Sequence, residues 1–139
     1  SGACKASNGA NTNLFYGLYN VKNISTGTQY VTCNTEFIRE YLINLLPGAG
    51  YRVSMIIGSS STVAQTVTCT ASVGNGGSAT QSTKTVTTVA GTPARLDYYP
   101  AELRAYSDTS SLAVYCGLKP GTSIGLFIAQ QPEKNVLIP

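Results

Sequence analysis

Four cysteines are the residues of this chain whose chemistry is simplest to assign: Cys4, Cys33, Cys69 and Cys116. Their number is even, their spacing is wide and irregular, and no two form a CxxC pair, which argues against a zinc site or a thioredoxin-type redox site. The pattern predicts two disulfides formed in an oxidising compartment, secreted or periplasmic. We favour the pairs Cys4–Cys33 and Cys69–Cys116, with Cys33–Cys116 and Cys4–Cys69 as the alternative.

The remaining reactive side chains give little support for catalysis. The chain has no histidine, which removes Ser-His-Asp and Cys-His arrangements and the commonest metal ligand. A glycosidase needs two carboxyl groups about 5 to 10 Å apart across one cleft. Glu36 and Glu40 are four residues apart and would share one face of a helix beside Arg39, which is also the pattern of a solvated helix face. We therefore expect no catalytic residue, no metal and no cofactor, and keep a carboxylate-pair hydrolase only as an alternative.

Tyrosine is the abundant aromatic residue: the chain has nine tyrosines and no tryptophan. Such rings can stack on sugars or anchor a protein interface. Tyr30 and Tyr115 each adjoin a cysteine that is expected to point inward, so both should face outward. Tyr98 and Tyr99 precede Pro100, in or near a loop. These four tyrosines are the predicted binding residues, and aromatic cover over a sheet face is the alternative role for any one of them.

Threonines alternate along two segments, at Thr66, Thr68 and Thr70 and again at Thr83, Thr85 and Thr87. Such rows could form a flat hydroxylated binding face, although exposed strand residues with high β-propensity explain them as well. The triplet Asn23-Ile24-Ser25 matches the N-glycosylation sequon, which has meaning only in a eukaryotic secretory pathway.

Composition limits the classes of partner. Charged residues make up 11% of the 139 residues, against about 25% in ordinary soluble domains. The net charge is +3, and no two basic residues are adjacent, so the sequence does not indicate a nucleic-acid binder. No stretch approaches the ~20 apolar residues of a membrane span. If the protein is exported, we expect its signal peptide to have been removed.

Short alternating segments separated by turn residues predict an all-β fold. The clearest strands are expected at 14–22, 28–33, 51–58, 64–73, 80–89, 95–99, 111–118 and 124–129, with a terminal strand at 136–138. The pairs 64–73 with 80–89 and 111–118 with 124–129 are expected to form hairpins. Residues 35–46 instead carry apolar residues at helical spacing before Pro47-Gly48, which predicts one short helix. The whole chain, 1–139, is then one mostly antiparallel β-sandwich, Ig-like or jelly-roll-like.

Strand phase indicates which way the cysteines point. Because side chains alternate across a strand, Cys116 shares its face with Leu112, Val114 and Leu118. Cys69 likewise shares its face with Val67, Ala71 and Val73, and Cys33 shares its face with Val31. The disulfides should therefore be buried core bridges, and any function should lie on the opposite faces and in the loops.

The cysteine-bearing segments TQYVTC, TVTCTASV and SLAVYCGLKPGTSI resemble those of a group of small exported proteins of Gram-negative bacteria whose function is not known. That resemblance covers about half of the chain, and its motifs are structural. It implies export, β-architecture and disulfides, and it carries over no functional residue. The segment 36–46 departs from the group, which has a polar loop there.

These observations favour a non-enzymatic, exported interaction domain that recognises a cell-surface glycan or another exported protein. A structural or assembly subunit of a surface structure is an alternative, and it would need an exposed edge strand or a donor-strand groove. The sequence does not indicate an oligomeric state.

Overall fold

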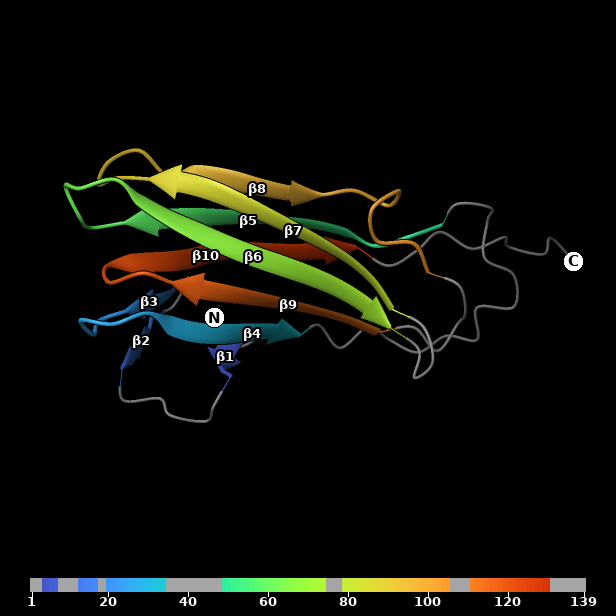
Figure 1. Cartoon of the computed structure of the whole chain (residues 1–139), viewed down its shortest axis with the longest axis horizontal. Coiled ribbons are helices and arrows are strands. Elements are labelled where there is room, and N and C mark those ends of the chain that lie inside the picture. The colour runs from blue at the N-terminus through green and yellow to red at the C-terminus, as the bar shows by residue number, and fades with distance from the viewer. Residues whose placement is uncertain are drawn as a thin grey trace, which may run out of the picture.

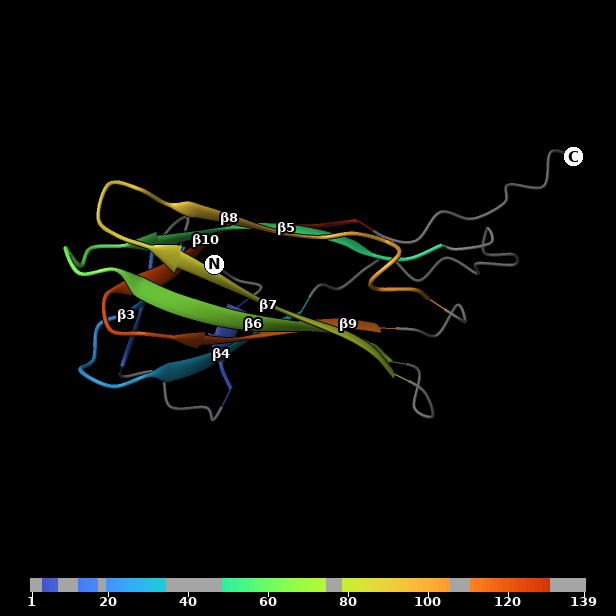
Figure 2. The ribbon, with the colours of Figure 1, turned by 45° about the horizontal axis from the view of Figure 1, so that its top comes forward.

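The computed structural model describes residues 4–7, 13–17, 20–34, 49–74, 79–105 and 111–130. These residues form ten strands in two five-stranded antiparallel sheets that face each other, as Figure 2 shows. The strands are β1 (Cys4–Ala6), β2 (Leu14–Tyr16), β3 (Asn20–Asn23), β4 (Gln29–Asn34), β5 (Arg52–Ser59), β6 (Gln65–Gly74), β7 (Ala79–Thr88), β8 (Ala94–Tyr98), β9 (Ser111–Leu118) and β10 (Thr122–Gln130).

Strand order identifies the kind of sandwich. The first sheet, sheet A, has the order β1-β4-β9-β6-β7, and the second, sheet B, has the order β2-β3-β10-β5-β8 (Figure 1). Strands β3 to β10 thus form two four-stranded sheets between which the chain crosses repeatedly, and only β6 and β7 are consecutive neighbours among these eight. This is the arrangement of a jelly roll, to which β1 and β2 each add one short edge strand. The all-β sandwich prediction is confirmed, in its jelly-roll form.

The core lies between the sheets and follows the predicted alternation. In β6, Val67, Cys69, Ala71 and Val73 are buried, while the hydroxylated residues between them face outward. In β5, Val53, Met55 and Ile57 are fully buried. Burial of such side chains is the main stabilising contribution, because each moves its apolar surface out of water.

Both disulfides have the favoured pairing. Cys4 bonds to Cys33 and Cys69 bonds to Cys116, and all four sulfur-bearing side chains are buried. In each case the two cysteines are direct cross-strand partners, in β1–β4 and in β6–β9. The bridges therefore join neighbouring strands of sheet A rather than strands of facing sheets. Loops of 29 and 47 residues are closed, which stabilises by about 3.5 to 4 kcal/mol each in the chain-entropy model.

Two expected strand relationships are wrong. The segment 14–22 is not one strand, because the chain reverses after Gly17, whose amide donates to the Asn20 carbonyl at 2.8 Å, and β2 pairs with β3. A Cβ atom at Gly17 would lie 2.5 Å from Asn20 Oδ1, so a larger residue there would require the Asn20 side chain to move. Strands β9 and β10 do not form a hairpin: β9 belongs to sheet A and β10 to sheet B. The β6–β7 hairpin is confirmed.

The turn between β9 and β10 carries the chain across the core. Thr122 is fully buried, and both its amide and its hydroxyl donate to the Lys119 carbonyl, at 3.0 and 2.7 Å. Gly121 has a φ of +81°, which favours glycine, and its amide donates to the Asn23 carbonyl at 3.0 Å. Because these bonds hold the turn against β3, the strand that follows enters sheet B.

Asn23 is a buried polar residue that links the two sheets. Its Nδ2 donates to the carbonyls of Gly27 and Leu118 at 2.7 and 2.8 Å, and its Oδ1 accepts from the amide and the hydroxyl of Ser25. The side chain is fully enclosed, so the sequon Asn23-Ile24-Ser25 presents no accessible amide nitrogen in the folded protein. Asn23 therefore has a structural role, because its hydrogen bonds shape the β3–β4 turn.

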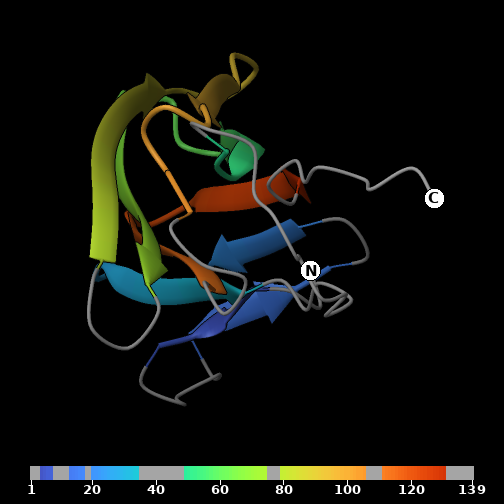
Figure 3. The same cartoon turned by 90° about the vertical axis from the view of Figure 1, so that its right-hand side faces the viewer.

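The edge formed by β7 and β8 is closed by Lys84, and these two strands come together on one side of the sandwich in Figure 3. Lys84 occupies the inward phase of β7, opposite Cys69. Its Nζ donates to the Asp97 carbonyl at 2.7 Å and lies 2.9 Å from a Glu102 carboxylate oxygen. A charge pointing inward on an edge strand opposes pairing with another chain.

The predicted helix at 35–46 and the strand at 136–138 lie outside the described residues and stay predictions. Within the described ranges, no helix has the length and apolarity that a transmembrane span requires.

Candidate binding grooves on the two sheet faces

Tyr30 and Tyr115 lie side by side on the outer face of sheet A. Tyr30 of β4 is opposite Gly117 of β9, and Tyr115 is opposite Thr32, so the two tyrosines are diagonal neighbours about 7–8 Å apart, within reach of aromatic side chains. Their exposed fractions are 67% and 48%. Both are outward, as strand phase predicted.

Gly117 provides the space into which the Tyr30 ring settles. A Cβ atom at this position would lie 3.3 Å from Cε1 of Tyr30, so the ring lies over the glycine backbone. This leaves a shallow groove of about 400 Å³ beside the rings, which we call the tyrosine groove. It is lined by Thr28, Tyr30, Thr66, Thr68, Thr70, Tyr115, Cys116, Gly117 and Lys119.

Threonine hydroxyls continue this face across β6 and β7. Thr68 and Thr85 are cross-strand partners with their Oγ1 atoms 2.8 Å apart, and Thr70 and Thr83 repeat the contact at 2.8 Å. A hydroxyl has one donor and two acceptor positions, so each bonded pair keeps one donor and several acceptors for a further partner. The array therefore offers both donors and acceptors beside two aromatic rings.

The charge of the tyrosine groove is small. Lys119, at one end, is the charged side chain among its lining residues. A hydroxyl-rich groove with exposed rings and one charged side chain suits a neutral polyhydroxylated ligand, whose C–H faces pack on aromatics and whose hydroxyls exchange hydrogen bonds with threonines.

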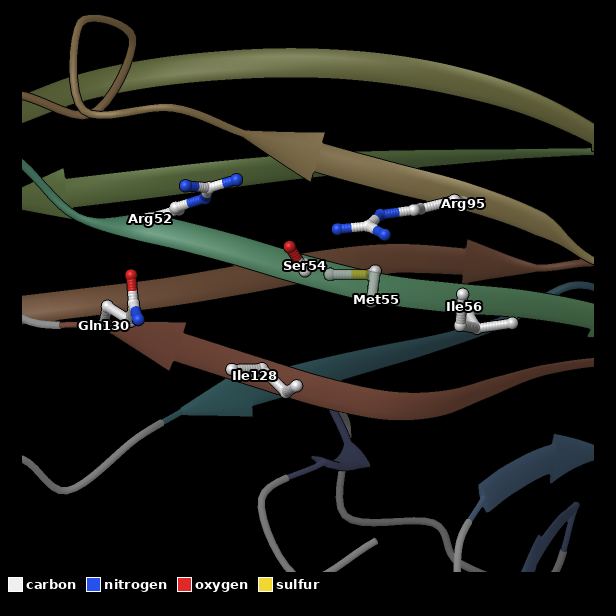
Figure 4. A pocket seen from close by; sticks show the side chains of 7 residues that line it. All are labelled: Arg52, Ser54, Met55, Ile56, Arg95, Ile128 and Gln130. Carbon is white, nitrogen blue, oxygen red and sulfur yellow. The ribbon is translucent and has the colours of Figure 1, made fainter.

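A second groove, the arginine groove, lies on the outer face of sheet B and holds about 300 Å³. Figure 4 shows its lining, which consists of Arg52, Ser54, Met55, Ile56, Arg95, Ile128 and Gln130. It lies over a β-bulge in β10, where Leu126 and Phe127 oppose the single residue Met55. The bulge reverses the phase of β10, so Ile124 is buried but Ile128, four residues later, is 48% exposed. Alternation alone predicts that both point the same way.

The other two predicted tyrosines are not in the tyrosine groove. Tyr98 is completely buried, and its hydroxyl donates to the Cys69 carbonyl at 2.6 Å, so it joins β8 to β6 across the core. Burial raises the pKa of this phenol above its ordinary value. The prediction of Tyr98 as a contact residue is therefore wrong: it lies inside β8 in the same phase as Leu96 and not in the loop.

Tyr99 is exposed and follows β8, close to one cation from each sheet. Its ring centroid lies 5.4 Å from the Arg52 guanidinium and 5.6 Å from the Lys84 ammonium. Its amide donates to Glu102 Oε2 at 2.9 Å, which closes a turn over Pro100. Tyr99 thus adjoins the arginine groove, and its role in binding stays a prediction.

The two carboxylates within the described residues are each held by a cation. The Ser54 hydroxyl, at 2.6 Å, holds the pKa of the Asp97 carboxyl below its usual range, and Arg95 adds to the effect. For Glu102, burial raises the pKa, but bonds from Lys84 and from the Tyr99 amide outweigh it and leave the pKa lowered. Neither is the raised-pKa acid of a glycosidase pair. Glu36, Glu40, Asp108 and Glu133 lie outside the described residues.

Comparison with known proteins finds similarity in fold and none in sequence family. No family model and no curated protein matches the sequence. Solved structures with a similar fold are of the carbohydrate-binding β-sandwich class.

One is TmCBM61 in complex with β-1,4-galactotriose, at a TM-score of 0.50 and 15% identity, covering 92% of this chain and 80% of that one. Another is the Clostridium thermocellum endo-1,4-β-D-xylanase 10B, as its CBM22-1-GH10 modules complexed with xylohexaose, at a TM-score of 0.51 and 14% identity. The second alignment covers 81% of this chain and 21% of the xylanase chain. At these identities the likeness extends to the fold alone.

Proposed function

We propose that this protein is a non-enzymatic, exported glycan-binding domain that holds a neutral saccharide in the tyrosine groove. The observation that carries the proposal is the convergence of Tyr30 and Tyr115 over Gly117, beside the threonine hydroxyls of β6. The two disulfides agree with export to a periplasmic or extracellular location. The similar fold of two proteins solved in complex with oligosaccharides supports the same class of ligand.

The groove, with a volume of about 400 Å³, has room for one or two sugar rings. Tyr30 and Tyr115 supply two aromatic surfaces that are preformed, because one rests on the Gly117 backbone and the other is flanked by Thr32 and Thr70. Preformed contacts reduce the entropy lost on binding. Hydroxyls of Thr68 and Thr70 lie on the next strand, where they can bond to equatorial sugar hydroxyls.

The test is a glycan array followed by calorimetric titration, with β-1,4-galactotriose and xylohexaose as the first probes. Each of Tyr30→Ala and Tyr115→Ala should weaken binding about tenfold or more, since truncation of a central aromatic contact typically costs over 1 kcal/mol. Tyr99→Ala is the matched control, because Tyr99 is 47% exposed, much like Tyr115, but lies outside the groove. It should leave affinity unchanged.

Two outcomes would contradict the proposal. One is the absence of binding to every glycan of the array. The other is a bound glycan whose affinity falls with Tyr99→Ala and not with the groove variants. Capture of an exported protein through Tyr30 and Tyr115, with no glycan bound, would instead support the interaction of two proteins.

A further inference from the structure

The arginine groove has features of a second, chemically different site. It lies on sheet B, whereas the tyrosine groove lies on sheet A, so a ligand in one makes no contact with the lining of the other. In Figure 4 the guanidinium groups of Arg52, from β5, and Arg95, from β8, lie on the same side of the sheet with the Ser54 hydroxyl between them. Ile128 and Gln130 of β10 form the opposite wall.

The orientation of Arg95 is set by its own salt bridge. Its Nε donates to both oxygens of Asp97, at 3.1 and 2.9 Å, and Ser54 Oγ donates to the same carboxylate at 2.6 Å. Asp97 is thus ionised at neutral pH and engages only the Nε position of the guanidinium. The terminal amino groups of Arg95 are the part that Figure 4 shows directed over the groove.

Arg52 is oriented by an aromatic contact instead. Its guanidinium carbon lies 5.4 Å from the Tyr99 ring centroid, an arrangement that leaves the in-plane N–H groups of a guanidinium available to an acceptor. Two arginines and one carboxylate give the groove a formal charge of +1. The remaining lining combines hydrogen-bonding groups, from Ser54 and Gln130, with the aliphatic surfaces of Ile56 and Ile128.

We infer that the arginine groove binds an acidic saccharide through the carboxylate of a uronic acid residue. Guanidinium groups bind carboxylates in a planar, two-bond geometry, and two of them face one groove here. Gln130 and Ser54 can bond to ring hydroxyls, while Ile56 and Ile128 can cover the C–H face of the sugar. Charge complementarity selects the acidic saccharide over the neutral one of the tyrosine groove.

The probe is α-1,4-linked trigalacturonate, titrated by calorimetry against its fully methyl-esterified form, which has the same ring skeleton without the charge. The acid should bind at least tenfold more tightly than the ester. Arg52→Gln and Arg95→Gln should each weaken binding of the acid about tenfold, because each removes a charge-assisted bond. Arg52→Gln leaves the Arg95–Asp97 pair intact, so it tests the site even if Arg95→Gln fails to fold.

Matched controls separate this site from general charge attraction and from the tyrosine groove. Lys22→Gln removes one positive charge from β3 of the same sheet, outside the groove, and should leave affinity unchanged. Tyr30→Ala combined with Tyr115→Ala should also leave it unchanged, so failure of the neutral-glycan proposal and failure of this one are distinguishable. Equal binding of acid and ester, equal loss with Lys22→Gln, or full displacement by equimolar inorganic phosphate would overturn the inference.

Discussion

At the scale of single residues, the tyrosines of this chain have three different roles. Tyr30 and Tyr115 are surface rings over one face, Tyr99 stacks beside Arg52, and Tyr98 is a core residue with a buried hydrogen bond. The difference follows from strand phase: Tyr98 alternates with Asp97 and Tyr99, so only one residue of the adjacent pair can face outward.

Tyr98→Phe tests the buried role. The substitution keeps the ring and removes the hydroxyl that bonds to the Cys69 carbonyl at 2.6 Å. We expect the free energy of unfolding to fall by about 1 to 2 kcal/mol, measured by urea denaturation, with glycan affinity unchanged. Tyr99→Phe, at an exposed ring, should stay within about 0.5 kcal/mol of the wild type. Equal stability of the two variants would contradict this account.

At the scale of elements, turns and irregularities decide which groups reach each face. The bulge in β10 turns Ile128 outward and forms part of the arginine groove, and the β9–β10 turn moves the chain from sheet A to sheet B. A turn also shapes the end of β8. The Tyr99–Glu102 turn lies against the segment that leads into β5, where the Tyr51 amide donates to the Leu103 carbonyl.

Gly50→Ala tests that packing. A Cβ atom at Gly50 would lie 2.3 Å from the Pro100 carbonyl oxygen and 2.6 Å from that of Leu103, and both are backbone atoms that cannot turn aside. We expect a loss of about 1 to 3 kcal/mol in unfolding free energy, because the turn must shift. Gly27→Ala is the control, since nothing lies within 4 Å of the position that its Cβ atom would take. A cost for Gly27→Ala as large as that for Gly50→Ala would show that the close approach is not the cause.

At the scale of the whole molecule, two carboxyl groups near the β7–β8 edge make the free energy of unfolding depend on pH. Glu102 anchors Lys84 of β7 beside β8, where the two sheets meet, and Asp97 anchors Arg95 within β8; both carboxyl groups have lowered pKa values. A carboxyl whose pKa is lower in the folded than in the unfolded state stabilises the fold above its unfolded pKa, about 4, and loses that effect as the pH falls through the folded pKa.

We therefore expect stability to fall as the pH is lowered below about 4, as measured by urea unfolding between pH 7 and pH 3. The double variant Asp97→Asn, Glu102→Gln should be less stable at pH 7 and should have a shallower pH dependence in that range. A slope as steep as that of the wild type would contradict the assignment to this edge.

The sequence by itself determined the class of fold and the outward direction of Tyr30 and Tyr115. Each of these depends on local alternation, and alternation has a fixed period of two along a strand. The inward phase of Cys69 and Cys116 likewise follows from their Val and Leu neighbours.

Only the tertiary structure decided which strands become neighbours. The proximity of Tyr30 and Tyr115 depends on β4 pairing with β9, and the groove shared by Arg52 and Arg95 depends on β5 pairing with β8. The two tyrosines are 85 positions apart in the sequence, and the two arginines are 43 positions apart. The bulge opposite Met55 and the crossing at Thr122 depend on contacts with other strands as well. Pairing between distant segments is selected by the packing of the whole core, so no local pattern encodes it.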